Sequence, residues 1–277
     1  MPKKLRFSRF VLSLVTTSFL TEIATITSIL PSQAASIAFS QISTELTNFS
    51  HAPDTTQTFS NTTTLAIALT NSSSSSIAQA EANFFVEPTL TTSEILSSAT
   101  GEGSDYFSSA QSEAQIIGNF AIDAGETFSF NFITAVNSLT SSDNLSSNES
   151  ASASGELSFL LTDTIAPSLV YNSFLLSFSL DIPISNNSLS LQTSNSFLLA
   201  SSTLSSNSEP TRNVTSALLQ GSLNHQFKNF TNITLTQDKN TQGSVAVPEP
   251  EALLGSLFFI GLIGIKYKTK KKPSCLR

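Results

Sequence analysis

The chain has 277 residues with 20 acidic and 13 basic side chains, a formal net charge of −7, and a single cysteine, Cys275. Residues 35–247 hold 17 of the acidic side chains but only three of the basic ones, which gives this stretch a formal charge of −14. Such an acidic, cysteine-free stretch excludes disulfides and thiol chemistry, and it argues against binding to nucleic acid or anionic lipid.

The N-terminal segment has the pattern of a secretory signal peptide. Basic residues gather within residues 3–9, a mostly apolar stretch follows, and small residues come next at Ala34 and Ala35. The sequence therefore predicts a signal peptide over residues 1–34, cleaved after Ala34 once the secretion translocon has exported the chain. Glu22 interrupts the apolar stretch, and an uncleaved N-terminal anchor is the alternative. Both interpretations place the following region outside the cytoplasm.

Residues 35–80 are rich in serine, threonine and asparagine, with few large apolar side chains. We expect them to form a low-complexity entry to the main domain, with room for a first strand at Thr64–Leu69.

The main domain is predicted over residues 81–237 from apolar side chains that alternate with polar ones. Phe128–Phe132 places three aromatic rings on one face of an extended segment, as a half-buried strand does. Further strands are predicted at Glu113–Phe120, Leu157–Leu161, Leu176–Leu180, Leu189–Leu191 and Ile233–Leu235. Turn-rich pieces lie at Gly101–Asp105, Asp123–Glu126, Thr140–Asn144, Ser185–Ser188 and Ser205–Ser208. Short alternating strands with polar turns predict an all-β fold, an antiparallel β-sandwich with polar loops.

Other segments of this region lack that alternation. Residues 137–154 and 201–213 are expected to be long loops, and Thr215–Leu223 is the one segment with an arguable helical period. Residues 238–247 are expected to be a spacer between the domain and the C-terminal segment.

The C-terminal segment, residues 248–277, combines three features in a fixed order. The motif Val247, Pro248, Glu249 and Pro250 precedes an uncharged apolar run from Ala252 to Ile265. A basic cluster follows, made of Lys266, Lys268, Lys270, Lys271, Lys272 and Arg277. As a helix the apolar run spans roughly 21 Å, which is short for a hydrocarbon core of about 30 Å. We expect a single membrane helix with its basic end in the cytoplasm, and a buried globular helix is the alternative.

This order of features resembles the PEP-CTERM sorting signal of bacteria. The resemblance implies cleavage near Pro248–Pro250 by an exosortase-type transpeptidase, and association with exopolysaccharide. The chain departs from the family pattern in having lysines where the family has an arginine-rich end. Asp123–Phe130 is loosely similar to a stretch of many ectodomains of that family. The resemblance brings no catalytic residue.

The sequence contains few residues suited to catalysis or metal binding. The only histidines are His51 and His225, and no Gly-x-Ser-x-Gly motif marks a nucleophilic serine. Glu102 and Asp105 are candidate calcium ligands in a glycine-rich turn, weighed against a solvated loop. Two tyrosines, Tyr106 and Tyr171, are candidates for stacking on a sugar. We predict no catalytic residue, no metal and no cofactor.

Three functions are compatible with these observations. The first is a non-enzymatic surface or extracellular-matrix protein, anchored transiently in the membrane and sorted through its C-terminal signal. The second is a carbohydrate- or calcium-binding β-sandwich module. The third is an exported hydrolase. Nucleic acid is not an expected partner.

Overall fold

The computed structural model describes residues 36–69, 72–87, 89–103, 105–143, 149–183 and 187–247. In these residues the chain forms twelve β-strands. None of the described residues belongs to a helix with the length and apolar character needed to cross a membrane. The strands are β1 (Ser36–Thr47), β2 (Thr55–Ala68), β3 (Ser73–Phe85), β4 (Leu90–Glu102), β5 (Tyr106–Ile122), β6 (Thr127–Ser142), β7 (Ser150–Asp163), β8 (Val170–Ile182), β9 (Ser188–Thr193), β10 (Phe197–Glu209), β11 (Arg212–Gln226) and β12 (Thr231–Val247).

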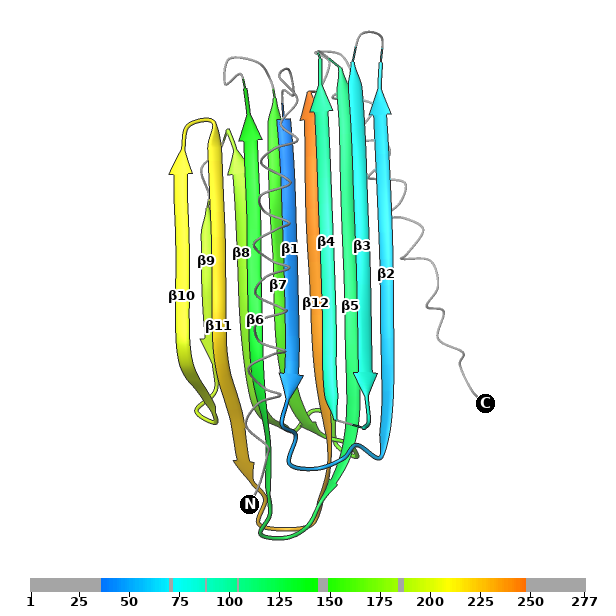
Figure 1. Ribbon diagram of the computed structural model, residues 1–277, viewed down its shortest axis with the longest axis vertical. Helices are drawn as coiled ribbons and strands as arrows, with labels where there is room; N and C mark the ends of the chain where they lie inside the picture. Colours follow the sequence, from blue (N-terminus) through cyan, green and yellow to red (C-terminus); the bar gives the residue numbers. More distant parts are fainter. Residues whose placement is uncertain are drawn as a thin grey trace, which may run out of the picture. The chain divides into compact units, whose positions relative to one another are not determined.

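The strands form two six-stranded sheets that lie face to face (Figure 1). Sheet A has the order β10-β11-β6-β1-β4-β3, and sheet B has the order β2-β5-β12-β7-β8-β9. Every neighbouring pair is antiparallel. The predicted all-β class and the antiparallel pairing are therefore confirmed.

Successive strands run in opposite directions along the chain, so the connections gather at two ends. We call the end where β1 begins and β12 finishes the proximal end, and the opposite end the distal end (Figure 1). The distal end carries the β1–β2 loop and the turns that follow β3, β5, β7, β9 and β11. At about 3.3 Å per residue, the 17 residues of β12 span about 55 Å between the two ends.

Large aromatic side chains fill the distal half of the space between the sheets. Inward positions of the distal half of β6 carry Phe128, Phe130 and Phe132, and each ring is at most 1% exposed. The ring of Phe132 lies 5.5 Å from that of Phe159 on β7 in the opposite sheet, centroid to centroid. The alternation in Phe128–Phe132 thus has the expected cause, because every second side chain enters the core.

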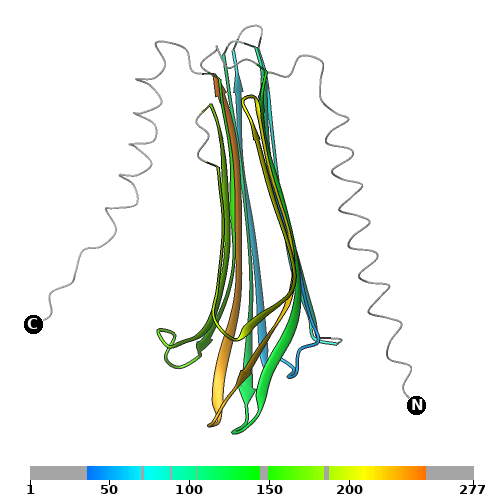
Figure 2. The ribbon, with the colours of Figure 1, turned by 90° about the vertical axis from the view of Figure 1, so that its left-hand side faces the viewer.

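The proximal half of the interior is built from small side chains instead. Ala38 and Ala99 of sheet A and Ala151 and Ala153 of sheet B are all buried. Added to Gly243 of β12, a methyl group would lie 3.1 Å from the carbonyl oxygen of Ala38. Figure 2 shows the sheets close together toward the proximal end and splayed at the distal end. Side-chain size therefore sets the separation of the sheets along the strands.

Several expected loops turn out to be strands. The low-complexity entry, residues 35–80, contains β1, β2 and the start of β3, and the expected spacer, residues 238–247, completes β12. The loop predicted over residues 201–213 holds most of β10 and the start of β11, including the expected turn Ser205–Ser208. The loop expected over residues 137–154 contains the end of β6 and the start of β7, and Thr215–Leu223 lies in β11 and is not helical. In β1 and at the end of β6, serine and threonine take inward positions, among them Ser40, Thr44, Ser138 and Thr140, so hydrophobicity alone does not reveal the period of two.

Candidate functional site

The strongest polar constellation lies at the distal end, where the β1–β2 loop meets the β5–β6 turn. The ring of Phe49 anchors the loop, because it stacks 5.9 Å from Phe120 and 5.5 Å from Phe130. The next two residues along the loop, Ser50 and His51, are thereby held beside β6. On the other side, Gly125 has φ 88°, a left-handed conformation that glycine adopts freely in a tight turn. Glu126 follows directly.

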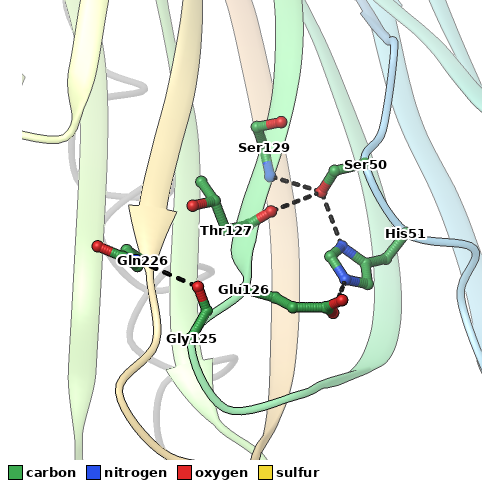
Figure 3. Close-up of polar contacts among 7 residues, drawn as sticks. All are labelled: Ser50, His51, Gly125, Glu126, Thr127, Ser129 and Gln226. Carbon is green, nitrogen blue, oxygen red and sulfur yellow. Dashed lines mark hydrogen bonds and ion pairs between the residues drawn. The ribbon is translucent and has the colours of Figure 1, made fainter.

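Ser50, His51 and Glu126 form a continuous chain of hydrogen bonds (Figure 3). The Oγ of Ser50 lies 2.8 Å from Nδ1 of His51, and Nε2 of the same ring lies 2.8 Å from Oε2 of Glu126. The hydrogen bond with His51 lowers the pKa of Glu126. The side chain of His51 is 20% exposed and that of Glu126 is 52% exposed. The constellation is therefore open to solvent.

Ser50 is also bonded to the backbone of β6. Its Oγ accepts a hydrogen bond from the N–H of Ser129 at 2.9 Å and donates to the carbonyl of Thr127 at 3.1 Å. Its own N–H donates to the carbonyl of Ser129 at 2.9 Å. A hydroxyl has one donor and two acceptor positions. If the hydroxyl hydrogen goes to Thr127, the remaining acceptor position takes a proton from Nδ1 of His51.

In that arrangement both ring nitrogens of His51 are donors, one to Ser50 and the other to Glu126. His51 and Glu126 then form an ion pair when the imidazole is protonated. In a catalytic triad the imidazole accepts the serine proton instead. The nearby N–H of Ser129 binds the serine oxygen itself, whereas an oxyanion hole needs donors aimed at the substrate oxygen. The geometry is that of a latch between the loop and β6.

A third segment joins the latch from β11. The side chain of Gln226 donates to the carbonyl of Gly125 at 3.1 Å (Figure 3). The N–H of Gly125 donates to the carbonyl of Phe227 at 2.8 Å, and the N–H of Phe227 donates to the carbonyl of Glu126 at 2.9 Å. The site therefore ties together connections from both sheets at the distal end.

The second histidine lies in a separate cluster of the same end. Nδ1 of His225 is 2.8 Å from the amide nitrogen of Asn172, and its ring packs against Tyr171 and Phe227. Burial lowers the pKa of His225. The hydroxyl of Tyr171 donates to Asp163 at 3.0 Å, and this carboxylate also caps the β7–β8 turn. These contacts give Tyr171 a structural role.

Two charged side chains inside the sandwich were not identified from the sequence. Lys239 of β12 is 3% exposed, and its Nζ donates to the carbonyl of Ser93 at 2.7 Å. Burial holds the pKa of Lys239 well below its ordinary value, and Glu94 opposes this shift. At the proximal end Glu149 is 7% exposed and accepts a hydrogen bond from Ser142 at 2.6 Å. From the sequence, Lys239 and Glu149 would be predicted to be solvent-exposed charges, because neither lies within an apolar segment.

The residues predicted as sites are not brought together. Tyr106 is buried near the proximal end, where burial raises its pKa to about 12, whereas Tyr171 lies at the distal end. The two tyrosines therefore form no common platform for a sugar. Glu102 and Asp105 flank the β4–β5 turn, but the part of the chain that the structure describes holds no group of three His, Cys, Asp or Glu side chains suited to a metal ion.

The predicted sorting signal follows β12, the last strand that the structure describes. Val247 is the last residue of β12 and pairs with Tyr106 of β5. Pro248, Glu249, Pro250, the apolar run Ala252–Ile265 and the basic cluster lie outside the described residues, as do Ala34 and Ala35. No protein-family model, no curated protein and no solved structure matches this chain.

Proposed function

We propose that the chain is an exported, non-enzymatic structural protein of the cell surface or extracellular matrix, held for a time by its C-terminal segment. In this proposal the Pro248–Pro250 motif is cut by an exosortase-type transpeptidase, and the mature domain associates with exopolysaccharide. The proposal extends the PEP-CTERM resemblance of the tail.

One observation supports a particular orientation of the domain relative to the membrane. Ser36 begins β1 and Val247 finishes β12 at the same end of the two sheets. An anchor that follows Val247 therefore holds the proximal end at the membrane, and the distal end points outward. With β12 about 55 Å long, the latch at the distal end would stand well clear of the lipid headgroups. A rigid module of this length suits a role in presentation or spacing.

The sorting step is tested by fractionation and intact-mass measurement of the native protein. We expect a mature species that lacks the C-terminal segment, and its loss when Pro248 and Pro250 are both changed to alanine. Glu251→Ala, just beyond the motif, serves as the matched control and is expected to leave processing unchanged. A tail that stays attached in the unmodified protein would refute the sorting step and leave a plain anchor.

The orientation needs a separate test. A short epitope inserted beside Ile165, which is 83% exposed in the distal β7–β8 turn, should be accessible to antibody on intact cells. The same epitope between Pro210 and Thr211, in a proximal turn, should be less accessible while the anchor is attached. Equal access in a chain that is still anchored would contradict the proposed orientation.

A hydrolase is the second candidate, and the contacts among Ser50, His51 and Glu126 are the observation that favours it. A fluorophosphonate probe labels a serine that a neighbouring base has activated. We expect the unmodified chain to show no more labelling than the Ser50→Ala variant, because backbone groups of β6 bind the hydroxyl of Ser50. Labelling of Ser50 would replace the structural proposal with an enzymatic one.

A further inference from the structure

The edges of the two sheets differ in a way that points to assembly. Among the described residues, β10 and β3 are the edge strands of sheet A, and β2 and β9 are those of sheet B. Natural sheet edges are usually protected by charges, prolines or short length, because an open edge pairs readily with another strand. Only β9, with six residues, is short.

The two exposed edges, β2 and β10, carry almost none of these protective features. The 14 residues of β2 include no charge and no proline, and the 13 residues of β10 include one charge, Glu209, at the very end. Both faces of these strands are exposed. On β2 the inward-facing Thr58 and Thr62 are exposed, and on β10 the inward-facing Leu204 is 45% exposed. The edge strand β2 thus extends past β3 of the opposite sheet, and β10 extends past β9.

The two overhangs lie on opposite sides of the molecule. Figure 1 places β10 and β9 on one side and β3 and β2 on the other. Each sheet has six strands that are all antiparallel, so its two edge strands run in opposite directions. A second copy placed beside the first in the same orientation would thus pair β10 with β3 and β9 with β2. Both new pairs are antiparallel, which continues each sheet without a break.

From these features we infer that copies of this chain associate side by side through their sheet edges into an open-ended filament. The overhanging β2 of one copy fills the place beside the short β9 of the next and covers the exposed inner face of its β10. Edges of 13 and six residues meet edges of 13 and 14, close to the 20–30 residues per partner of a typical specific interface. Because the two surfaces differ, the contact is heterologous, and because neighbouring copies share one orientation, it repeats without closing into a ring. The inference does not depend on export or sorting.

The register of the strands gives the residues that meet. One row of neighbours crosses sheet A from Ser205 on β10 through β11, β6, β1 and β4 to Gln79 on β3. Both end residues are exposed. A copy added without a shift along the strands brings Ser205 opposite Gln79 of the next copy.

Cysteine cross-linking of the full chain tests this contact. In a Cys275→Ser background, the double variant Ser205→Cys with Gln79→Cys is oxidised in detergent solution and run on a non-reducing gel. We expect a ladder of dimers, trimers and longer species. Each single variant should stay monomeric, because the contact joins two different edges. A dimer from Ser205→Cys alone would show a two-fold contact, and a double variant without a ladder would show no contact; either result overturns the inference.

A second measurement separates edge pairing from association through the C-terminal segment. Leu204→Lys adds a charge to the inner face of β10, which the next copy would cover, and Ile165→Lys is a matched control in a distal turn. Both changes affect exposed side chains, and circular dichroism verifies that each variant is folded. By light scattering we expect assemblies from the unmodified chain and the control, and monomers from Leu204→Lys. Equal masses for the three proteins would refute edge pairing.

Discussion

Replacing Lys239 with methionine is expected to change how the free energy of unfolding depends on pH. The amine of Lys239 is almost completely buried and donates to the carbonyl of Ser93, and burial holds its pKa well below 10.5. Between the lowered folded pKa and about 10.5, the unfolded chain therefore binds a proton that the folded chain does not. In this window stability rises with pH, by about 1.4 kcal/mol per unit.

The methionine variant has no such proton, so its stability should lack this slope. Below the window both states of the natural chain are protonated, and the charged amine penalises the fold; the variant should then be the more stable protein. Above the window the amine is neutral in both states, and the variant loses the hydrogen bond to Ser93 at a cost of about 1–3 kcal/mol. The order of the two stabilities is thus expected to reverse as pH rises.

Urea denaturation followed by circular dichroism, repeated from pH 6 to pH 11, measures the difference directly. Other titrating groups are common to both proteins and cancel when the two curves are subtracted. Parallel curves for the natural chain and the variant would mean that the buried amine keeps its charge or its ordinary pKa. The account of Lys239 as a neutral buried donor would then be refuted.

Two further outcomes are expected from the distal end. Glu126→Gln should speed amide exchange in residues 48–54, because it weakens the hydrogen bond to His51. Since the pKa of Glu126 is lowered, the latch of the natural chain should hold above that pKa and release as pH falls through it. Unchanged exchange in the variant would show that Phe49 alone holds the loop. Phe159→Ala should destabilise the fold by about 3–5 kcal/mol in urea denaturation, because the ring is fully buried among four other phenylalanines. Phe59→Ala, at a phenylalanine that is 55% exposed, is the control and should destabilise the fold far less. Equal losses of stability would contradict the distal core described above.

The sequence indicates the fold class wherever large apolar side chains mark the inward face. Phe128–Phe132 and Leu176–Leu180 alternate visibly, and both lie in strands with buried inward positions. The second half of β12 was missed because its inward positions hold Lys239, Thr241 and Gly243. Polar and small residues thus occupy core positions of this strand, and hydrophobicity does not reveal their alternation with outward residues.

The latch is beyond prediction from the sequence for a different reason. Ser50 and His51 are adjacent in the chain, but Glu126 is far away in sequence and reaches them only through the pairing of β1 with β6. That pairing depends on a strand, β1, whose residues resemble a low-complexity linker. In the sequence, His51 therefore lies within the low-complexity entry with no predicted partner.

The position of β12 in sheet B determines how the domain would respond to mechanical tension. β12 lies between β5 and β7, and it is paired with β5 along its entire length. A pull on the chain beyond Val247, resisted at the distal end, acts along the strands and therefore across hydrogen bonds that run perpendicular to them. All of these bonds share the force at once instead of opening one after another. The domain is accordingly arranged to resist stretching along its length.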